Sequence, residues 1–289
     1  NRVMISKVLL PVDFSPRDRA AAHSVKELAK KLRFETILLH VVPPPDYEAA
    51  VLEAGGPALD ELIENRRKLA GEKLKRDCLE ELAGMEVRRE LVSGFPSEEI
   101  IEFAMRERVD LIVMPTHGYV PFRRFLLGSV VSKVLHDAQL PVMTGAHMAD
   151  HPEGPNPFAT VAAAIDLSPN SGRVLEYAAG LAKQLGARLK VLHALAEITS
   201  HMGFNFEVKE EVHFEKPARE MIAKLCAGLG VPYEVEMETG DPGKTICELV
   251  KRSRADVTVI GRSSASGLGR LRAHAYAIIR ESSVPVISV

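Results

Sequence analysis

Short apolar runs alternate with amphipathic stretches along the 289-residue chain. In the first half these runs are KVLLPVD, TILLHVV, VRRELVS, LIVMP and PVMT, and several are continuously apolar, as strands covered on both faces are. Between the first two runs, residues 17–32 place one set of apolar side chains on a single helical face: Ala21, Ala22, Val25, Leu28, Ala29 and Leu32. Such strand–helix alternation predicts a parallel, doubly wound α/β sheet with helices on both faces.

The segments before the predicted helices carry helix-start signals. DFSPRD predicts Ser15 as an N-cap with Pro16 at the first helical position, and DLSPNS repeats this pattern with Ser168 and Pro169. GFPSEE places Ser97 before two glutamates, which favours a helical first turn.

The second half of the chain repeats the first. KVLLPVDFSP is matched by TVAAAIDLSP, so that Asp13 corresponds to Asp166, and ILLHVV is matched by KVLHAL. VDLIVMPTHG is matched by ADVTVIGRSS, and LPVMTG by VPVISV, in the same order. This duplication predicts two tandem doubly wound domains, each a five-stranded parallel sheet, at residues 1–147 and 159–289. A Pro/Gly/polar linker is expected at 148–158.

Charge and cysteine content exclude several classes of protein. The chain has 37 Lys and Arg against 39 Asp and Glu, a net charge of -2, which gives no basis for binding nucleic acid or an anionic membrane. No apolar run approaches the roughly 18 residues of a membrane span, and NRVMISKVLL lacks a signal-peptide core. The three cysteines are few and unpatterned, which favours a reducing, cytoplasmic location over a disulfide frame or a zinc site.

The stretch MPTHGYVPFRRFLLGSVVSKV, residues 114–134, follows an apolar strand pattern and leads into a helical one. Gly118 permits a turn or a close backbone approach. Gly128 and Ser129 open the helix, where free N–H groups and the serine hydroxyl favour an anion. Asp13 ends the first strand and is suited to a ribose hydroxyl or a magnesium ion. Because GxxxxGK[ST] is absent, this is not a P-loop.

The motifs LLPVDFS, LLHVV, SGFPSEEI, and PTHG followed nine residues later by GSV resemble the universal stress protein family, whose nucleotide signature is G-x2-G-x9-G-[ST]. The resemblance covers nearly the whole chain, as two tandem domains. It implies a five-stranded parallel α/β fold of the adenine nucleotide alpha hydrolase-like kind. Some members of this family bind ATP or AMP between the first and fourth strands.

The resemblance also implies which residues of the first domain bind ATP or AMP. An adenosine pocket is expected from Pro11, Val12, Asp13 and Val41, with Asp13 also in reach of a magnesium ion. Contacts to ribose and phosphates are expected from Met114, Pro115, His117 and Gly118. Gly128, Ser129 and Val130 are expected to hold the phosphates through backbone N–H groups and a hydroxyl.

The first domain departs from the signature at one position, where Pro115 replaces the first glycine. Proline has no N–H, so one hydrogen bond to a ligand is lost, worth roughly 0.5–1.5 kcal/mol, or up to about tenfold in affinity. Arg123 and Arg124 in the same loop can compensate by pairing with phosphates. The alternative, that these two arginines form a solvent-exposed basic turn, is at least as well supported.

The second domain departs much further. Gly261 is present, but Ser264 replaces the second glycine and His274-Ala275 replaces the Gly-Ser pair. The histidine side chain would intrude where phosphate approaches, and the hydroxyl is lost. The second domain is therefore predicted to have lost its ATP site. Its Gly/Ser-rich stretch at 261–270 leaves open the binding of a different small anion.

The remaining histidines are interpreted as structural. His40 and His193 lie within apolar strand runs and are predicted to be core histidines with satisfied hydrogen bonds. His147 and His151 share the i,i+4 spacing of helical zinc ligands but lie in the linker and lack the motif's glutamate. For His117 a ligand contact is favoured over a general base, and no catalytic residue is assigned.

Three functional classes remain open. The first is a stress-response regulator that binds an adenine nucleotide in its first domain, for which the discriminating feature is the intact Gly118, Gly128 and Ser129. The second is an interaction scaffold that uses no nucleotide, and the third is an enzyme, with slow ATP hydrolysis as its mildest form. The segments PVMTG and PVISV are predicted to pair within one chain as a pseudo-dimer, with a homodimer also open.

Overall fold

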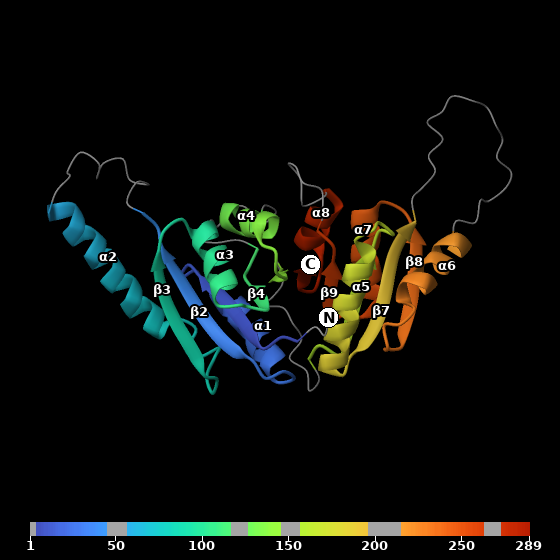
Figure 1. Cartoon of the computed structure of the whole chain (residues 1–289), viewed down its shortest axis with the longest axis horizontal. Coiled ribbons are helices and arrows are strands. Elements are labelled where there is room, and N and C mark those ends of the chain that lie inside the picture. The colour runs from blue at the N-terminus through green and yellow to red at the C-terminus, as the bar shows by residue number, and fades with distance from the viewer. Residues whose placement is uncertain (1–3, 45–56, 117–126, 146–156, 196–214, 263–272) are drawn as a thin grey trace, which may run out of the picture. The chain divides into compact units, whose positions relative to one another are not determined.

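The computed structural model describes residues 4–44, 57–116, 127–145, 157–195, 215–262 and 273–289. The chain divides into two compact units, Met4–Pro157 and Phe158–Val289, which are taken one at a time below (Figure 1). The predicted linker falls largely outside the described residues. Of the helices that the structure describes, none is both long and apolar enough to cross a membrane.

The first unit alternates strands and helices throughout its length. Its elements are β1 (Lys7–Val12), α1 (Asp18–Ala29), β2 (Glu35–Val42), α2 (Pro57–Arg76), β3 (Val87–Ser93), α3 (Pro96–Arg106), β4 (Leu111–Val113), α4 (Ser129–Asp137) and β5 (Val142–Thr144). The strands lie in the order β3-β2-β1-β4-β5, and every neighbouring pair is parallel.

The second unit repeats this arrangement. Its elements are β6 (Thr160–Ile165), α5 (Ser171–Leu185), β7 (Arg188–Leu195), α6 (Glu215–Cys226), β8 (Tyr233–Thr239), α7 (Pro242–Ser253), β9 (Val257–Ile260), α8 (Ala273–Glu281) and β10 (Val286–Ser288). The strand order is β8-β7-β6-β9-β10, again parallel at every neighbouring pair.

These sheets confirm the predicted fold class of two tandem, doubly wound, parallel α/β domains. In each unit the chain first adds strands on one side of the first strand and then returns to add strands on the other. Right-handed crossovers therefore place the first two helices on one face and the last two on the opposite face. The helix contacts agree, because α3 packs on α4, α5 on α6, and α7 on α8.

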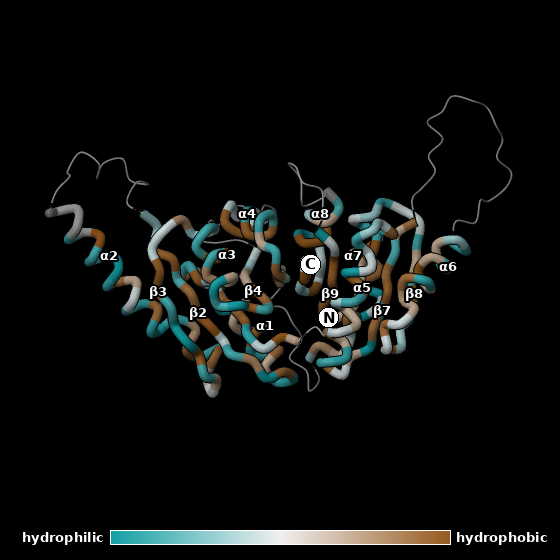
Figure 2. The backbone as a smooth tube through the Cα atoms, in the orientation of Figure 1, coloured by the Kyte–Doolittle hydropathy of each residue, from teal (hydrophilic) through white to brown (hydrophobic). Residues whose placement is uncertain are grey.

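The core of each unit is built from the strands. Leu9, Leu10, Leu38 and Leu111 are fully buried in the first sheet, as expected of strands covered on both faces. Figure 2 shows hydrophobic residues along the strands of each unit and a largely hydrophilic α2. All three cysteines are buried and unlinked: Cys78, Cys226 and Cys247.

The predicted helix starts at Ser15 and Ser168 are wrong. α1 begins at Asp18 and α5 at Ser171, each two to three residues later than the sequence pattern suggested, and neither has a side-chain cap at its N-terminus. Ser15 and Ser168 lie instead in a tight turn that precedes each helix.

Two aspartates account for these turns. Asp13 Oδ1 accepts the N–H of Ser15 at 3.0 Å, and Asp166 Oδ1 accepts the N–H of Ser168 at the same distance. The residue between each pair is left-handed, with φ of 64° at Phe14 and 58° at Leu167. Aspartate competes effectively for a backbone N–H two residues ahead, and the helix can begin only after this turn is complete.

Candidate functional site

The candidate site of the first domain lies where the strand order reverses, at the carboxyl ends of β1 and β4. Pro11 and Val12 end β1, and Asp13 follows it directly. Met114 and Pro115 follow β4, which pairs with β1. The topology thus brings together two segments that the sequence assigned to one site. Open α/β sheets bind ligands at this reversal point.

The Asp13 side chain is exposed at this edge of the sheet. Its backbone N–H donates to Asp18 Oδ2 at 3.1 Å, and its own Oδ1 accepts from Ser15. The first contact holds the Asp13 backbone, and the second fixes the direction of its carboxylate. The structure therefore presents Asp13 as a rigid acceptor facing solvent at the end of β1.

Asp18, in the first turn of α1, is a partner that the sequence did not reveal. Its side chain is almost completely buried, 1% exposed, and burial together with the neighbouring charges of Asp13 and Asp77 raises the pKa of Asp18 to about 8. Burial likewise raises the pKa of Asp77. Asp18 is therefore mostly protonated and neutral at pH 7. Within the described ranges, no group of three or more His, Cys, Asp or Glu side chains is arranged to hold a metal ion.

His40 and Phe14 cover the neighbouring part of the site. His40 Nδ1 lies 2.8 Å from the Val12 carbonyl oxygen, which accepts its hydrogen, and the Phe14 ring stacks on the imidazole with centroids 4.1 Å apart. The Lys73 ammonium lies 5.8 Å from the Phe14 centroid. Burial lowers the pKa of His40, so the ring is neutral at pH 7. The adjacent Val41 is buried, 7% exposed.

The loop after β4 is described only at its two ends. His117 and Gly118 lie outside the described residues, as do Arg123 and Arg124. The ends of the loop are joined by one backbone hydrogen bond, from the Gly128 N–H to the Thr116 carbonyl oxygen at 2.9 Å. Thr116 is buried, so this bond anchors the start of α4 to the end of β4.

The first turn of α4 offers donors to an anion. Gly128 is the N-cap residue, with extended backbone and no side-chain cap, and its carbonyl oxygen accepts the Ser132 N–H at 2.8 Å. The N–H groups of the residues between, Ser129 and Val130 among them, have no acceptor within the helix. Ser129 is exposed and Val130 half-buried. The Gly128 N–H itself is engaged by Thr116, so the helical N–H groups are the donors that remain.

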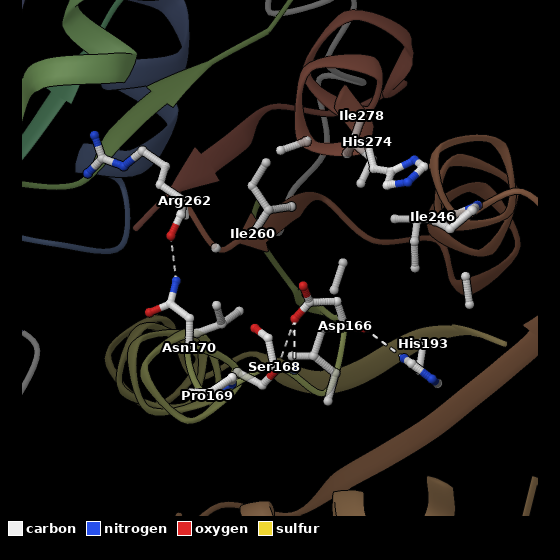
Figure 3. Close-up of a pocket in the computed structure, with 18 residues that line it drawn as sticks. Asp166, Ser168, Pro169, Asn170, His193, Ile246, Ile260, Arg262, His274 and Ile278 are labelled. Carbon is white, nitrogen blue, oxygen red and sulfur yellow. Dashed lines mark hydrogen bonds between the residues drawn. The ribbon is translucent and has the colours of Figure 1, made fainter. Parts of the chain in front are cut away.

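The second domain contains a cavity of about 370 Å³ at the corresponding place, shown in Figure 3. It lies at the carboxyl ends of β6 and β9 and is bounded by the first turns of α5, α7 and α8. This volume falls in the range of small-molecule sites. The sequence predicted a degenerate nucleotide site here. The loss of signature residues gave no indication that a cavity is present.

His274 and Ala275, in the first turn of α8, line this cavity. The prediction that they replace Gly128 and Ser129 is wrong, because α4 and α8 have the same length and lie at the same interval before β5 and β10, which aligns Ser129 with Ala273. Asp166 lies on the opposite side, where its Oδ1 accepts from the Ser168 N–H and from the Ser171 hydroxyl at 3.3 Å.

His193 also lines the cavity. Its Nδ1 lies 2.8 Å from the Ile165 carbonyl oxygen, and the side chain is buried. The prediction that His40 and His193 are core histidines with satisfied hydrogen bonds is confirmed for His193, whereas His40 makes the same bond but is only half-buried. Its extension to a purely structural role is incomplete, because the ring of His193 forms part of a cavity wall.

Gly261 has a packing role that explains its presence in a degenerate signature. A Cβ atom at this position would lie 2.9 Å from Asn170 Nδ2 and 3.1 Å from Val174 Cγ2. Asn170 reaches past Gly261 to donate to the Arg262 carbonyl oxygen at 2.6 Å. The glycine is thus required by the neighbouring helix α5, with or without a ligand.

Comparison with known proteins places both domains in one family. The model of the universal stress protein family matches residues 4–144 and 157–289. A universal stress protein of Methanocaldococcus jannaschii is 31% identical over 140 residues, which is 48% of this chain and 81% of that protein.

A solved structure shows the same fold. A universal stress protein from Archaeoglobus fulgidus is 23% identical, with a TM-score of 0.69, and the match covers 99% of this chain and 96% of that one. Another solved universal stress protein, 23% identical, with a TM-score of 0.36 and covering 46% of this chain and 97% of its own, is in complex with cAMP.

Proposed function

The chain belongs to the universal stress protein family, and from this premise we propose that it is a stress-response regulatory protein that binds ATP or AMP in its first domain only. The observation that carries the proposal is the placement of Gly128 and Ser129 at the start of α4. A loop joins β4 to this helix start. Because β4 pairs with β1, the end of β4 lies beside the end of β1, where Asp13 follows.

Each part of this site suits one part of an adenine nucleotide. The free N–H groups of the first turn of α4 and the exposed Ser129 hydroxyl are donors for phosphate oxygens, and the helix dipole favours negative charge there. Asp13 is an acceptor for ribose hydroxyls. The buried Val12 and Val41 supply apolar surface beside it for the base.

A magnesium ion would depend mainly on the nucleotide. Of the two described aspartates at the end of β1, Asp13 is exposed, whereas Asp18 is buried, burial raises its pKa to about 8, and its Oδ2 accepts from the Asp13 backbone. Magnesium is commonly held by one or two carboxylates together with substrate phosphates and water. The residues present therefore fit a magnesium ion bound with the phosphates, with Asp13 as its protein ligand.

Pro115 predicts a nucleotide site that is weakened and not abolished. It stands between the buried Met114 and Thr116, and the Gly128–Thr116 hydrogen bond closes the loop without an N–H from Pro115. The expected penalty is one hydrogen bond to the ligand, up to about tenfold in affinity.

We assign the protein a binding role and propose no catalytic step. Slow ATP hydrolysis is tested by release of inorganic phosphate from Mg-ATP in the presence of the purified chain. Release that scales with protein and is lost in a Ser129→Ala variant would replace the binding role with an enzymatic one.

The second candidate function is an interaction scaffold that uses no nucleotide. The observation that favours it is the double departure from the family signature, at Pro115 in the first domain and, in the second, at Ala273, which aligns with Ser129. The two candidates are separated by denaturing freshly purified, unsupplemented protein and identifying the released small molecules by mass spectrometry. ATP or AMP near one per chain supports the nucleotide proposal. Empty protein that also ignores added Mg-ATP supports the scaffold.

The assembly we propose follows from the duplication. One chain carries both copies of the final strand, β5 and β10, so pairing of these strands can satisfy both edges within a single chain. Light scattering is expected to give a monomer. An obligate dimer in which the two strands of one chain are separated would contradict the pseudo-dimer.

A cytoplasmic location is part of the same proposal. It is supported by the three buried, unlinked cysteines, since a reducing compartment keeps thiols in this state. Fractionation of the source cells tests it directly.

A further inference from the structure

Asp13 is held through both of its neighbours in the chain by one side chain, His40. The Nδ1 atom of His40 lies 2.8 Å from the Val12 carbonyl oxygen, and because a carbonyl oxygen only accepts, this nitrogen carries the hydrogen. The Phe14 ring stacks on the same imidazole, with centroids 4.1 Å apart and the two ring planes inclined by 30°. Residues 12 and 14 are thereby fixed to one ring, with Asp13 between them.

The backbone of Phe14 needs such a contact, because its conformation is unfavourable. Its φ of 64° lies in the left-handed region, which a bulky side chain seldom adopts. Stacking on His40 favours this conformation, and so does the Lys73 ammonium 5.8 Å from the centroid of the Phe14 ring. Since Phe14 shares a peptide bond with Asp13, a change of its backbone conformation would also turn the Asp13 carboxylate.

The second domain secures the equivalent turn in another way. Leu167, also left-handed with a φ of 58°, stands in place of Phe14 and has no ring to stack on His193. Instead, the Ser171 hydroxyl donates to Asp166 Oδ1 at 3.3 Å and holds that carboxylate directly.

The first domain has no serine at the position of Ser171. Asp18 stands there, and its Oδ2 accepts the Asp13 N–H and so holds the backbone. The aspartate-to-amide bond of the turn is 3.0 Å long in both domains, so the ring stack is not required for the turn to form. The stack instead stabilises the turn where the serine hydroxyl is missing. It does so without occupying an oxygen of the Asp13 carboxylate, which leaves these oxygens to a ligand.

We propose that His40 and Phe14 are positioning residues of the first-domain nucleotide site, which fix the Asp13 carboxylate as the acceptor of the ribose hydroxyls. This inference rests on the proposed function, because it takes ATP or AMP as the ligand of the first domain. Neither side chain needs to touch the nucleotide, since both act through Asp13. An acceptor that is fixed in advance lowers the cost of ordering it on binding, so removal of the stack weakens the contacts that Asp13 makes.

Two variants remove the stack by different routes. Phe14→Leu copies the second domain, whose turn forms with Leu167, so this variant is expected to fold. His40→Asn keeps an N–H donor for the carbonyl oxygen at the end of β1 but removes the ring. His193→Asn is the matched control, because His193 makes the equivalent bond in the second domain.

The measurement is calorimetric titration of each full chain with Mg-ATP and with Mg-2′,3′-dideoxy-ATP, which lacks both ribose hydroxyls. The parent is expected to bind ATP about tenfold to a hundredfold more tightly than the dideoxy nucleotide. In Phe14→Leu and His40→Asn, the affinity for ATP should fall about threefold to tenfold, while that for the dideoxy nucleotide stays within about twofold. His193→Asn should match the parent. General destabilisation would lower both affinities alike, so the ratio of the two identifies a positioning role.

Asp13→Ala tests whether the stack acts through this aspartate. In that background, Phe14→Leu should cause no further loss of ATP affinity, because the acceptor that it positions is gone. Additive losses would overturn the proposal, and so would an unchanged preference for ATP in either Phe14→Leu or His40→Asn. A parent that binds both nucleotides equally would overturn it as well, while leaving nucleotide binding in place.

A measurement without nucleotide separates this proposal from the proposed function. Hydrogen exchange of the Ser15 N–H, which donates to Asp13 Oδ1, should be about threefold or more faster in Phe14→Leu than in the parent. The Ser168 N–H of the second domain should exchange at the parent's rate. If the parent binds neither nucleotide, the proposed function fails and this comparison decides. Faster exchange at Ser15 alone then supports the positioning role, and equal rates contradict it.

Discussion

Asn170 and Gly261 are in such close contact that a Cβ on Gly261 would come within 2.9 Å of Asn170 Nδ2. Asn170 crosses this point to reach the Arg262 carbonyl oxygen. A glycine that belongs to a nucleotide signature is therefore retained in the second domain for packing between β9 and α5. Its counterpart in the first domain is Pro115, which shows that glycine is not required at this position for the fold alone.

Gly261→Ala is expected to destabilise the second domain by about 1–3 kcal/mol, because the added methyl must displace Asn170 and Val174. The measurement is the denaturant midpoint of the full chain. Asn170→Ala is the matched background: it removes the nearest contact, so the same Gly261→Ala change should cost less there. Equal costs in the two backgrounds would show that Asn170 is not what requires the glycine.

Asp18 makes the stability of the first domain depend on pH. Its pKa is about 8 in the folded chain against 3.8 for the unperturbed side chain. Between these values the folded state holds a proton that the unfolded state has lost. Stability therefore falls as pH rises from about 4 to about 8, by at most about 1.4 kcal/mol per pH unit from this group.

Asp18→Asn removes this dependence, because the amide oxygen can still accept the Asp13 N–H while no charge is buried. The variant should gain stability over the parent as pH rises from 6 to 8.5, measured as the difference in denaturant midpoint. The reverse trend, with the parent gaining on the variant toward alkaline pH, would mean that Asp18 is ionised and stabilised in the folded chain.

Asp110 links the start of β1 to β4. One of its oxygens, Oδ2, accepts from the Ser6 N–H at 2.8 Å, the Ser6 hydroxyl at 2.7 Å and the Lys7 N–H at 2.9 Å. Asp110→Ala is expected to destabilise the first domain by about 1–3 kcal/mol, because it leaves these donors without their acceptor. The shift in thermal midpoint measures the cost.

The duplication supplies a control for that change. Asp256 occupies the same place in the second domain, and its Oδ2 accepts the Thr160 N–H at 2.8 Å. Asp256→Ala should also destabilise, because it leaves the N–H of the buried Thr160 without its acceptor, but by less than Asp110→Ala, which removes the acceptor of three hydrogen bonds. A larger loss for Asp256→Ala would contradict the ranking of these two carboxylates by their hydrogen bonds.

The sequence predicted the fold well because the fold depends on periodicity and repetition. Apolar runs located the strands, and Asp13 and Asp166 aligned the two copies before any geometry was known. The helix starts at Ser15 and Ser168 were misplaced because two alternatives compete locally. A serine can cap a helix, or its N–H can bond to an aspartate two residues earlier, and the second arrangement occurs here.

The sequence predicted that the end of β1 and the residues after β4 lie together, but it did not predict the electrostatics there. The strand order brings Asp13 beside the residues after β4, as the family resemblance implied. Asp18 gave no signal, because an aspartate in a first helical turn is ordinary and its burial depends on how α1 packs. The second-domain cavity was also missed, since a pattern of lost signature residues says nothing about the space they leave.

The prediction nearest to function concerns the start of α4, which the Gly128–Thr116 hydrogen bond anchors to the end of β4. Gly128→Asp places a carboxylate at the start of α4, where phosphate oxygens are expected, and should abolish ATP binding. Ser129→Ala removes one hydroxyl donor and should weaken binding by up to about tenfold. His274→Asp, a change in the first turn of α8 in the second domain, should leave ATP binding intact.

Calorimetric titration of Mg-ATP into the full chain tests the central claim most directly, with Gly128→Asp and His274→Asp run in parallel. Nucleotide binding in the first domain predicts one equivalent in the parent and in His274→Asp, and none in Gly128→Asp. Full stoichiometry retained in Gly128→Asp, or no binding by the parent, would contradict a nucleotide site at the start of α4.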